Sequence, residues 1–475
     1  MEEKSLKIMY VASEASPFVQ TGGLGDVMGA LPTALAALRK DCNIGCILPL
    51  YKQVGDIYRD KMQKLLDISF NLSWRNTGAA VYSLDRCGVT YYFIENHYYF
   101  DRESLYGEYD DGERFVFFGR AVAEFLSYEE YTPDVLHAND WQASSAILFL
   151  NTDYKHLGVK TVFTIHNIEF QGKMNPYVLG DVFGLNESYL EVLSHRGDIN
   201  LMKCGMILAD KVTTVSPNYA CELRHDYFSH GLGDIVNLIY DKLVGIINGI
   251  DYGYYSPELG GDIDYKYSKR TVRSGKAKNK ESLLRELSLS TDEDIPLLIM
   301  VTRLTEQKGI DLLLGVADEL LSLNLQLIIL GTGERKYEER LVELEKKYPN
   351  FKAFLMFDRV LAKRLYASAD ILLMPSKAEP CGLSQMIATA YGTVPIVRSV
   401  GGLCDTIIPY NNEFCCGFRF DNYNAHELLY TVKLAADVFK NKEKWHGIRK
   451  RAINRDFSWN NSAKEYMLIY EEIIK

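Results

Sequence analysis

The chain has 475 residues, which is too many for one ordinary hydrophobic core, so we expect at least two domains. Its apolar fraction of 47% and charged fraction of 24% are typical of globular proteins, and no apolar run is long enough to span a membrane. The formal net charge of −10 argues against the large basic face that nucleic-acid binding needs. We therefore expect neither a nucleic-acid partner nor a membrane partner.

The start of the chain and its cysteines both predict a cytoplasmic location. The first residues lack the basic start, apolar stretch and small residues of a secretory signal. The nine cysteines are scattered, no Cys-x-x-Cys occurs, and most lie in apolar runs, as reduced thiols do.

In the first half, short apolar runs alternate with helical patterns, and the runs are apolar throughout, as strands covered on both faces are. The predicted strands are residues 6–12, 44–48, 91–95, 135–138, 161–165, 212–215 and 244–247. Between the first two, Val27, Leu31, Leu35 and Leu38 keep helical spacing. This alternation indicates a parallel sheet with helices on both faces.

A second pattern of the same kind begins after Pro296. Its predicted strands are residues 297–301, 326–330, 353–357, 371–374 and 394–397, and residues 310–320 form a predicted helix. A turn-rich stretch at 248–261 suggests the boundary. The fold class is therefore α/β, with two facing, doubly wound, Rossmann-like domains and a cleft between them. We assign residues 1–250 and 251–455 to the domains, and expect a helix at about 456–475 to pack back on the first.

Ligands of open α/β sheets bind beyond the carboxyl ends of the strands, so those ends carry the candidate site residues. The first strand leads into a loop from Glu14 to Asp26 that contains Gly22, Gly23 and Gly25. Glycine N–H groups and a helix N-terminus can hold an anion there. Alternatively, the loop is a tight turn with Asp26 as the helix N-cap. Neither a dinucleotide fingerprint nor a P-loop is present.

In the second half, three strand ends carry residues suited to a phosphorylated ligand. Arg303 and Lys308 follow one predicted strand, and their charges suit a diphosphate leaving group. Glu379 follows another strand, before a turn at Cys381-Gly382-Leu383. A second Gly-Gly-Leu-x-Asp sequence begins at Gly401. Solvated surface cations and a carboxylate at a helix N-terminus are the simpler structural explanations.

Two further candidates follow strands of the first half. His166 and Asn167 come directly after residues 161–165, and Asp140 and Trp141 come after residues 135–138. A single histidine is more often structural than catalytic. Because neighbouring parallel strands end at the same sheet edge, His166 and Asp140 favour a shared functional site.

These segments, in order from residue 6 to about 410, resemble the glycogen and starch synthase family of retaining glycosyltransferases with the GT-B architecture. The segments that carry the resemblance are Thr21 to Val27, His137 to Trp141, Phe163 to Gly172, Thr214 to Pro217, Asn248 to Asp251, Arg303 with Lys308-Gly309, Gly331 to Gly333, Ser376 to Leu383, and Gly401 to Leu403. The ordered set is specific, whereas each member alone is weak.

The resemblance implies a hexosyltransferase of glycogen biosynthesis. Its donor is a nucleotide-glucose, ADP-glucose in most bacterial members, and its acceptor is the non-reducing end of an α-1,4-glucan. The resemblance assigns catalytic roles to His166, Glu379, Arg303, Lys308 and Asp140. It assigns substrate-binding roles to Glu14, Gln20, Thr21, Gly22, Gly23, Asp26, Trp141, Asn167, Asn248, Gly333, Cys381, Gly382, Leu383, Gly401, Gly402 and Leu403. It implies no cofactor and no metal.

The sequence also contains a departure from the family motif, and it allows two alternative functions. The family motif usually begins with lysine where this chain has Gln20, and losing that charge at a phosphate costs roughly ten- to a hundredfold in donor use. A related enzyme with another donor, such as UDP-glucose, and a weakly active glucan-binding paralogue are the alternatives. Asp262 and Asp264 imitate a metal-binding Asp-x-Asp sequence, and we interpret them as a solvated linker loop.

Overall fold

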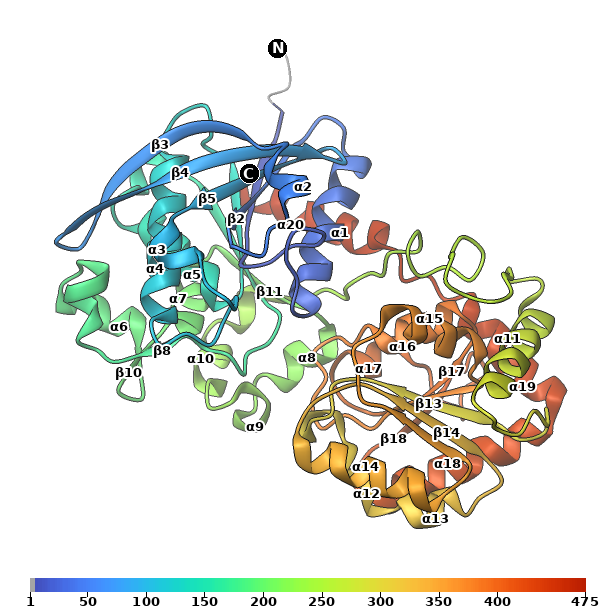
Figure 1. The fold of residues 1–475 in the computed structure, drawn as a ribbon. Coiled ribbons are helices and arrows are strands. Elements are labelled where there is room, and N and C mark those ends of the chain that lie inside the picture. Colours follow the sequence, from blue (N-terminus) through green and yellow to red (C-terminus); the bar gives the residue numbers. More distant parts are fainter. Residues whose placement is uncertain (1–4) are drawn as a thin grey trace. The chain divides into compact units, whose positions relative to one another are not determined.

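The computed structural model describes residues 5–475, which divide into two compact units (Figure 1). Unit 1 contains the residues up to Gly249 together with Trp459–Lys475, and unit 2 is Ile250–Ser458. Within the described residues, no helix is long and apolar enough to cross a bilayer.

Unit 1 is built on a sheet of nine strands in the order β12-β11-β7-β6-β1-β2-β5-β4-β3. The strands are β1 (Lys7–Val11), β2 (Asn43–Pro49), β3 (Gln63–Leu72), β4 (Arg75–Arg86), β5 (Val89–Glu95), β6 (Val135–Asn139), β7 (Lys160–Ile165), β11 (Lys211–Thr214) and β12 (Leu243–Gly245). The seven predicted strands are all present and parallel to one another. Two strands that were not predicted, β3 and β4, add an antiparallel hairpin at the sheet edge beside β5.

Helices cover both faces of this sheet (Figure 1). The longer ones are α1 (Gly23–Leu38), α4 (Asp111–Leu126), α5 (Trp141–Asn151), α7 (Leu201–Leu208) and α20 (Trp459–Ile473). Shorter elements are α2 (Asp56–Arg59), α3 (His97–Phe100), η1 (Lys155–Leu157), η2 (Leu179–Phe183), η3 (Glu187–Tyr189), α6 (Leu190–Leu193), α8 (Pro217–Glu222), α9 (Asp226–Ser229), α10 (Gly233–Leu238) and η4 (Tyr240–Lys242). A small separate sheet joins β8 (Lys173–Met174), β10 (Asp198–Asn200) and β9 (Ser194–His195).

The C-terminal helix α20 is anchored in unit 1 by a buried tyrosine. The hydroxyl of Tyr470 lies 2.6 Å from that of Tyr10 on β1 and 2.7 Å from Nδ1 of His137 on β6. Burial lowers the pKa of His137 to about 3, so its ring is neutral and serves packing and hydrogen bonding.

Unit 2 is a parallel sheet of six strands in the order β15-β14-β13-β16-β17-β18, which is the strand order of the Rossmann fold. The strands are β13 (Leu297–Val301), β14 (Gln326–Leu330), β15 (Phe351–Phe354), β16 (Ile371–Met374), β17 (Val394–Arg398) and β18 (Phe418–Phe420). β18, which has only three residues, was not predicted. The helices are α11 (Val272–Glu286), η5 (Glu306–Lys308), α12 (Ile310–Gly315), α13 (Ala317–Leu321), α14 (Arg335–Lys347), α15 (Arg359–Ser368), α16 (Ser384–Ala390), α17 (Gly401–Thr406), α18 (Ala425–Lys440) and α19 (Lys442–Ile453).

One expectation for unit 2 was inexact. Residues 310–320 do not form a single helix, because the chain leaves helical geometry at Val316 and divides into α12 and α13. The apolar residues of both pieces still face one core with β13 and β14, so the apolar spacing continues across the break.

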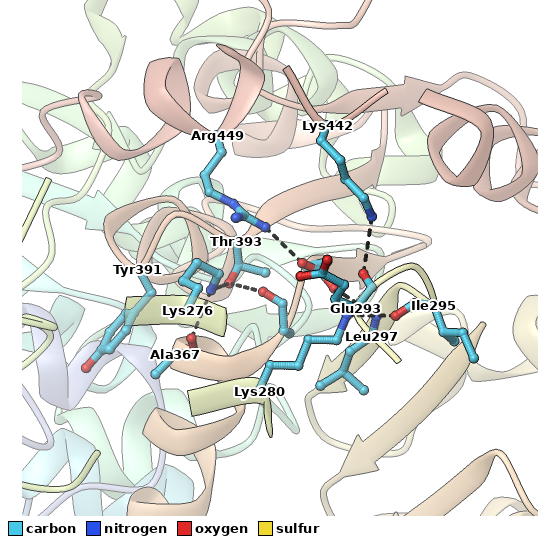
Figure 2. Close-up of polar contacts among 12 residues, drawn as sticks. Lys276, Lys280, Glu293, Ile295, Leu297, Ala367, Tyr391, Thr393, Lys442 and Arg449 are labelled. Carbon is cyan, nitrogen blue, oxygen red and sulfur yellow. Dashed lines mark hydrogen bonds and ion pairs between the residues drawn. The ribbon is translucent and has the colours of Figure 1, made fainter. Parts of the chain in front are cut away.

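A buried ionic network ties the ends of unit 2 to its sheet (Figure 2). Asp370, just before β16, accepts hydrogen bonds from Lys280 on α11 at 2.7 Å and Arg449 on α19 at 2.8 Å. It also accepts a backbone N–H from Leu297 at 3.1 Å. Burial alone would raise the pKa of Asp370, but the two cations hold it below its usual value.

Candidate active site

The site in unit 2 forms where the strand order reverses, between β13 and β16. The loop after β13 carries Lys308, and the loop after β16 carries Glu379. The ammonium of Lys308 donates to both carboxylate oxygens of Glu379, at 2.7 and 2.9 Å. Their side chains are only 16% and 7% exposed, so the pair is largely shielded from water. Two residues 71 positions apart in the sequence therefore lie together at the ligand-binding edge of the sheet.

One side-chain contact and one backbone contact fix the position of Glu379. The Ser376 hydroxyl donates to its carboxylate at 3.0 Å, and the N–H of Gly402 donates to its carbonyl at 3.1 Å. Gly401 has φ +44°, and a Cβ there would collide with the same carbonyl. The first turn of α17 therefore packs directly against the Glu379 loop, which explains why glycine is needed at position 401.

The glycine pair of unit 2, Gly401-Gly402, already makes contacts within the protein. Gly401, Gly402 and Leu403 are buried, and they form the start of α17 rather than an open loop. The N–H of Gly402 is already used by the Glu379 loop, so in this structure it does not face an anion.

The other predicted residues of unit 2 differ in exposure and in hydrogen bonding. Arg303 is exposed and has no ion-pair partner among residues 5–475, which leaves its guanidinium available to a ligand. Cys381 is buried, and Gly382 adopts φ +75° in the turn that leads through Leu383 into α16. The N–H of Gly333 donates to Glu338 at 2.9 Å.

Arg398 is a supporting residue that was not predicted from the sequence. Its guanidinium donates to the backbone carbonyls of Ser376 and Lys377, at 3.3 and 2.8 Å, and lies 5.5 Å from the ring centre of Tyr423. The N–H of Lys377 in turn donates to the carbonyl of Gln307 at 2.8 Å. Arg398 thus supports the Glu379 loop, and the Lys377 N–H joins that loop to the Lys308 loop. Its position at the end of β17 was the available sequence signal.

The site in unit 1 also lies at a reversal of strand order, between β1 and β6. The side-chain Nδ2 of Asn139 donates to the carbonyls of Val11 and His137, which fixes its Oδ1 as an acceptor. That oxygen lies 2.9 Å from Nε2 of His166, so Nε2 carries the proton. His166 therefore presents Nδ1 as an acceptor. Asn139 was not predicted as a site residue, although it adjoins Asp140.

Burial shifts the protonation of both partly buried residues here. It lowers the pKa of His166 to about 3, so the ring is neutral near pH 7. Burial also raises the pKa of Asp140 to about 7. The backbone N–H groups of His166 and Asn167 donate to its carboxylate at 2.8 and 3.4 Å and lower the pKa, but burial has the larger effect. Asp140 thus changes its charge near neutral pH, next to the histidine.

We expect Asp140→Asn to change how stability depends on pH. The pKa of Asp140 is about 3.8 in the unfolded chain and is raised to about 7 in the folded protein. Its contribution to stability is therefore fully present below pH 3.8 and is lost as the pH rises through about 7. Relative to wild type, the variant should therefore gain in free energy of unfolding between pH 4 and 7 and level off above. Urea unfolding at four pH values measures this gain, and parallel pH profiles would contradict the shifted pKa.

The glycine loop of unit 1 wraps around a buried carboxylate. Glu14 accepts hydrogen bonds from the N–H and hydroxyl of Thr21, at 2.5 and 2.8 Å, and from the N–H of Gly25 at 3.3 Å. Gly22 and Gly23 are exposed at the start of α1. The alternative with Asp26 as the N-cap was wrong: the N-cap is Gly22, and Asp26 lies in the first turn.

The remaining predicted residues of unit 1, Trp141 and Asn248, are both buried but differ in their contacts. Trp141 packs edge-on against Phe115 at 5.2 Å, with Gly172 close to its ring, which is a core position. Asn248 is 6% exposed, and its buried Oδ1 accepts no hydrogen bond within the part of the chain that the structure describes. Such an unsatisfied acceptor is costly unless a ligand or water completes it.

Asp262 and Asp264 are not the solvated loop that the sequence suggested. Asp262 accepts a hydrogen bond from Lys363 at 2.7 Å, and Asp264 lies 3.3 Å from Arg364, both on α15. The two carboxylates therefore attach the segment before α11 to α15, and each already has a cationic partner.

The fold defines the class of protein first. The chain aligns with sucrose-phosphate synthase from Thermosynechococcus elongatus, with a TM-score of 0.61 and 18% identity over 98% of each chain. It has the GT-B architecture of glycosyltransferases, with two Rossmann-like domains. The family "Glycosyl transferases group 1" matches residues 286–455.

More similar proteins narrow the class to one family. The "Starch synthase catalytic domain" family matches residues 7–237. Glycogen synthases of Clostridium novyi and Geobacillus stearothermophilus are 42% and 41% identical, over 99% of this chain and 99% and 98% of theirs. The catalytic domain of starch synthase IV from Arabidopsis thaliana, solved with ADP and acarbose, has a TM-score of 0.90 and 30% identity over 99% of each chain. The chain belongs to the glycogen and starch synthase family and is a hexosyltransferase of that type.

Proposed function

We propose that this protein transfers glucose from ADP-glucose to the non-reducing end of an α-1,4-glucan, with retention of the anomeric configuration. The Lys308–Glu379 pair at the strand reversal of unit 2 carries the proposal, because it puts a cation and a carboxylate where the bound nucleotide-sugar is expected. The ADP in the starch synthase IV structure supports adenine as the donor base, and its acarbose supports a glucan acceptor.

In this proposal, unit 2 binds the donor and stabilises the leaving diphosphate. Two of the three Lys308 protons are directed at Glu379, so one remains for a phosphate oxygen. Arg303 supplies a second cation with planar, bidentate geometry. Glu379 contacts the hydroxyls of the donor glucose. The cations stabilise charge that develops as the glycosidic bond breaks, which is the largest contribution that such a site makes to the rate.

Unit 1 supplies neutral hydrogen-bonding groups. The Nδ1 atom of His166 accepts a hydrogen bond from a sugar hydroxyl, and the ring stays neutral because burial lowers its pKa to about 3. A two-step mechanism would need a carboxylate nucleophile close to an acid partner. Glu14 accepts hydrogen bonds from Thr21 and Gly25, and Asp140 accepts one from the N–H of His166, so both carboxylates are engaged in holding loops of unit 1. We infer that the acceptor hydroxyl attacks on the face that the diphosphate leaves.

Initial rates with glycogen and a panel of ADP-, UDP- and GDP-glucose test the donor assignment. We expect ADP-glucose to have the highest kcat/KM. A preference for UDP-glucose would keep the enzyme class and overturn the donor. Retention of protein by glycogen without any transfer would instead favour the paralogue that only binds glucan.

Replacing Gln20 by lysine should raise kcat/KM for ADP-glucose by roughly tenfold, because a charged hydrogen bond to phosphate is stronger than a neutral one. The Gln20 amide now folds back to donate to the carbonyl of Gly22 at 3.3 Å, beside the exposed glycines. Gln20→Met has similar length without charge and is the matched control. Equal rates for both variants would show that the missing charge does not limit turnover.

We further propose that the protein works in the cytoplasm. All nine cysteines are unpaired, and six of them are buried as free thiols. Disulfides are rare in reducing compartments, so this pattern supports the assignment.

A further inference from the structure

The tip of the β3–β4 hairpin carries an unusually exposed tryptophan. Trp74 is 74% exposed, whereas Trp141, Trp445 and Trp459, the other three tryptophans, are between 2% and 9% exposed. Burial of an indole ring is strongly favourable, so an indole held in water calls for an explanation in terms of binding.

The Trp74 ring is held in place rather than left mobile. Its indole N–H donates to Oδ1 of Asp181 at 2.8 Å, and the Arg75 guanidinium lies 4.8 Å from its ring centre. Arg75 also donates to Oδ2 of Asp181 at 3.0 Å. The Ser73 hydroxyl donates to the carbonyl of Gly180 at 2.6 Å, which ties the turn to η2. The indole N–H, together with Arg75, keeps the pKa of Asp181 low, so the carboxylate is charged.

This arrangement has the chemistry of a sugar-binding platform. A fixed aromatic ring can stack on the C–H face of a glucose unit, and the carboxylate and guanidinium at its edge can hydrogen-bond the ring hydroxyls. The charged neighbours, including Glu113 at 3.8 Å from Arg75, differ from the apolar centre of a protein–protein interface. The ligand expected here is therefore uncharged, with both apolar and hydroxyl faces.

We propose that Trp74, Arg75 and Asp181 form a second α-glucan-binding site, separate from the reacting end of the acceptor. This inference rests on the proposed function, because a glucan polymer supplies many chains to one enzyme molecule. Holding one chain at Trp74 raises the local concentration of the other ends for transfer. Loss of the site should therefore weaken the use of glycogen as acceptor and leave the use of a short acceptor unchanged.

Trp74 makes the proposal directly measurable by fluorescence. Because the other tryptophans are buried, iodide quenches mainly the emission of Trp74. We expect maltoheptaose to shield Trp74 from iodide, and Trp74→Ala to remove the quenchable component. Quenching that is identical with and without maltoheptaose would overturn the proposal, whether or not the enzyme transfers glucose. Shielding in a protein without transferase activity would support the site and contradict the proposed function alone.

Kinetics and binding supply the second test. Trp74→Ala should raise KM for glycogen about tenfold, while KM for maltotriose and kcat stay unchanged. Migration in a native gel that contains glycogen should show the same loss of retention. Tyr227→Ala removes another aromatic side chain of unit 1, 61% exposed, and is the matched control. Equal effects of the two variants, or wild-type self-association that Trp74→Ala abolishes, would overturn the glucan site.

Discussion

Replacing Lys308 by alanine is expected to lower kcat/KM for ADP-glucose by about 10²- to 10³-fold, the usual effect of removing one group that stabilises transition-state charge. The variant loses a cation from the leaving diphosphate. It also leaves the carboxylate of Glu379, whose side chain is 7% exposed, without its ionic partner. Initial rates at varied donor concentration measure the loss. Lys347→Ala, which breaks an exposed pair with Asp318 in the same unit, is the matched control.

A second substitution separates the two roles within the pair. Glu379→Gln keeps the shape of the side chain, and its amide oxygen still accepts a hydrogen bond from Lys308, so ADP binding measured by calorimetry should persist. Transfer should fall, because the charge that orients the sugar and balances Lys308 is gone. Near-wild-type rates for Lys308→Ala, in a variant shown by circular dichroism to be folded, would refute the role of the pair.

The largest effect on stability is expected at Asp370. Asp370→Ala leaves Lys280 and Arg449 buried without their shared anion, and breaking a buried ion pair in this way costs about 3–5 kcal/mol. Nearby Lys276 is also buried, and it donates to the Thr393 hydroxyl at 2.7 Å and to the carbonyl of Tyr366 at 2.9 Å (Figure 2). Both of these acceptors are neutral, so neither can replace the carboxylate of Asp370.

Urea unfolding of Asp370→Ala and Asp370→Asn measures this cost. The asparagine variant keeps an acceptor for the N–H of Leu297 but not the charge, so its midpoint should lie between those of alanine and wild type. Asp318→Ala removes an exposed carboxylate and should change the midpoint little. A wild-type midpoint for Asp370→Ala would show that the network does not stabilise unit 2.

The continuously apolar strands were the most predictable part of the fold. β13, β14 and β16 were predicted with the bounds that the structure has, because both faces of these strands are covered and their composition shows it. β3 and β4 were missed because their residues alternate between buried and exposed, and charged residues interrupt the apolar pattern. The three residues of β18 are too few to show any period.

For the site, sequence order revealed which residues follow strands but not what they bond to. Lys308 and Glu379 were both predicted, and their direct contact follows from β13 and β16 being neighbours in the sheet. The role of Asn139 in setting the His166 tautomer could not be predicted, because it depends on two backbone carbonyls contributed by different strands. The hydrogen bond from the Gly402 N–H to the Glu379 carbonyl could not be predicted either, because it joins two loops that follow different strands.

The most direct test of the account is the stereochemistry of transfer and its dependence on Lys308. Purified protein is incubated with maltoheptaose and ADP-glucose labelled with ¹³C at the anomeric carbon, and the product is followed by NMR. The account predicts a new labelled α-1,4 anomeric signal that Lys308→Ala slows about 10²-fold or more. A labelled β-anomeric linkage, or an α-1,4 signal that forms equally fast without Lys308, would contradict it.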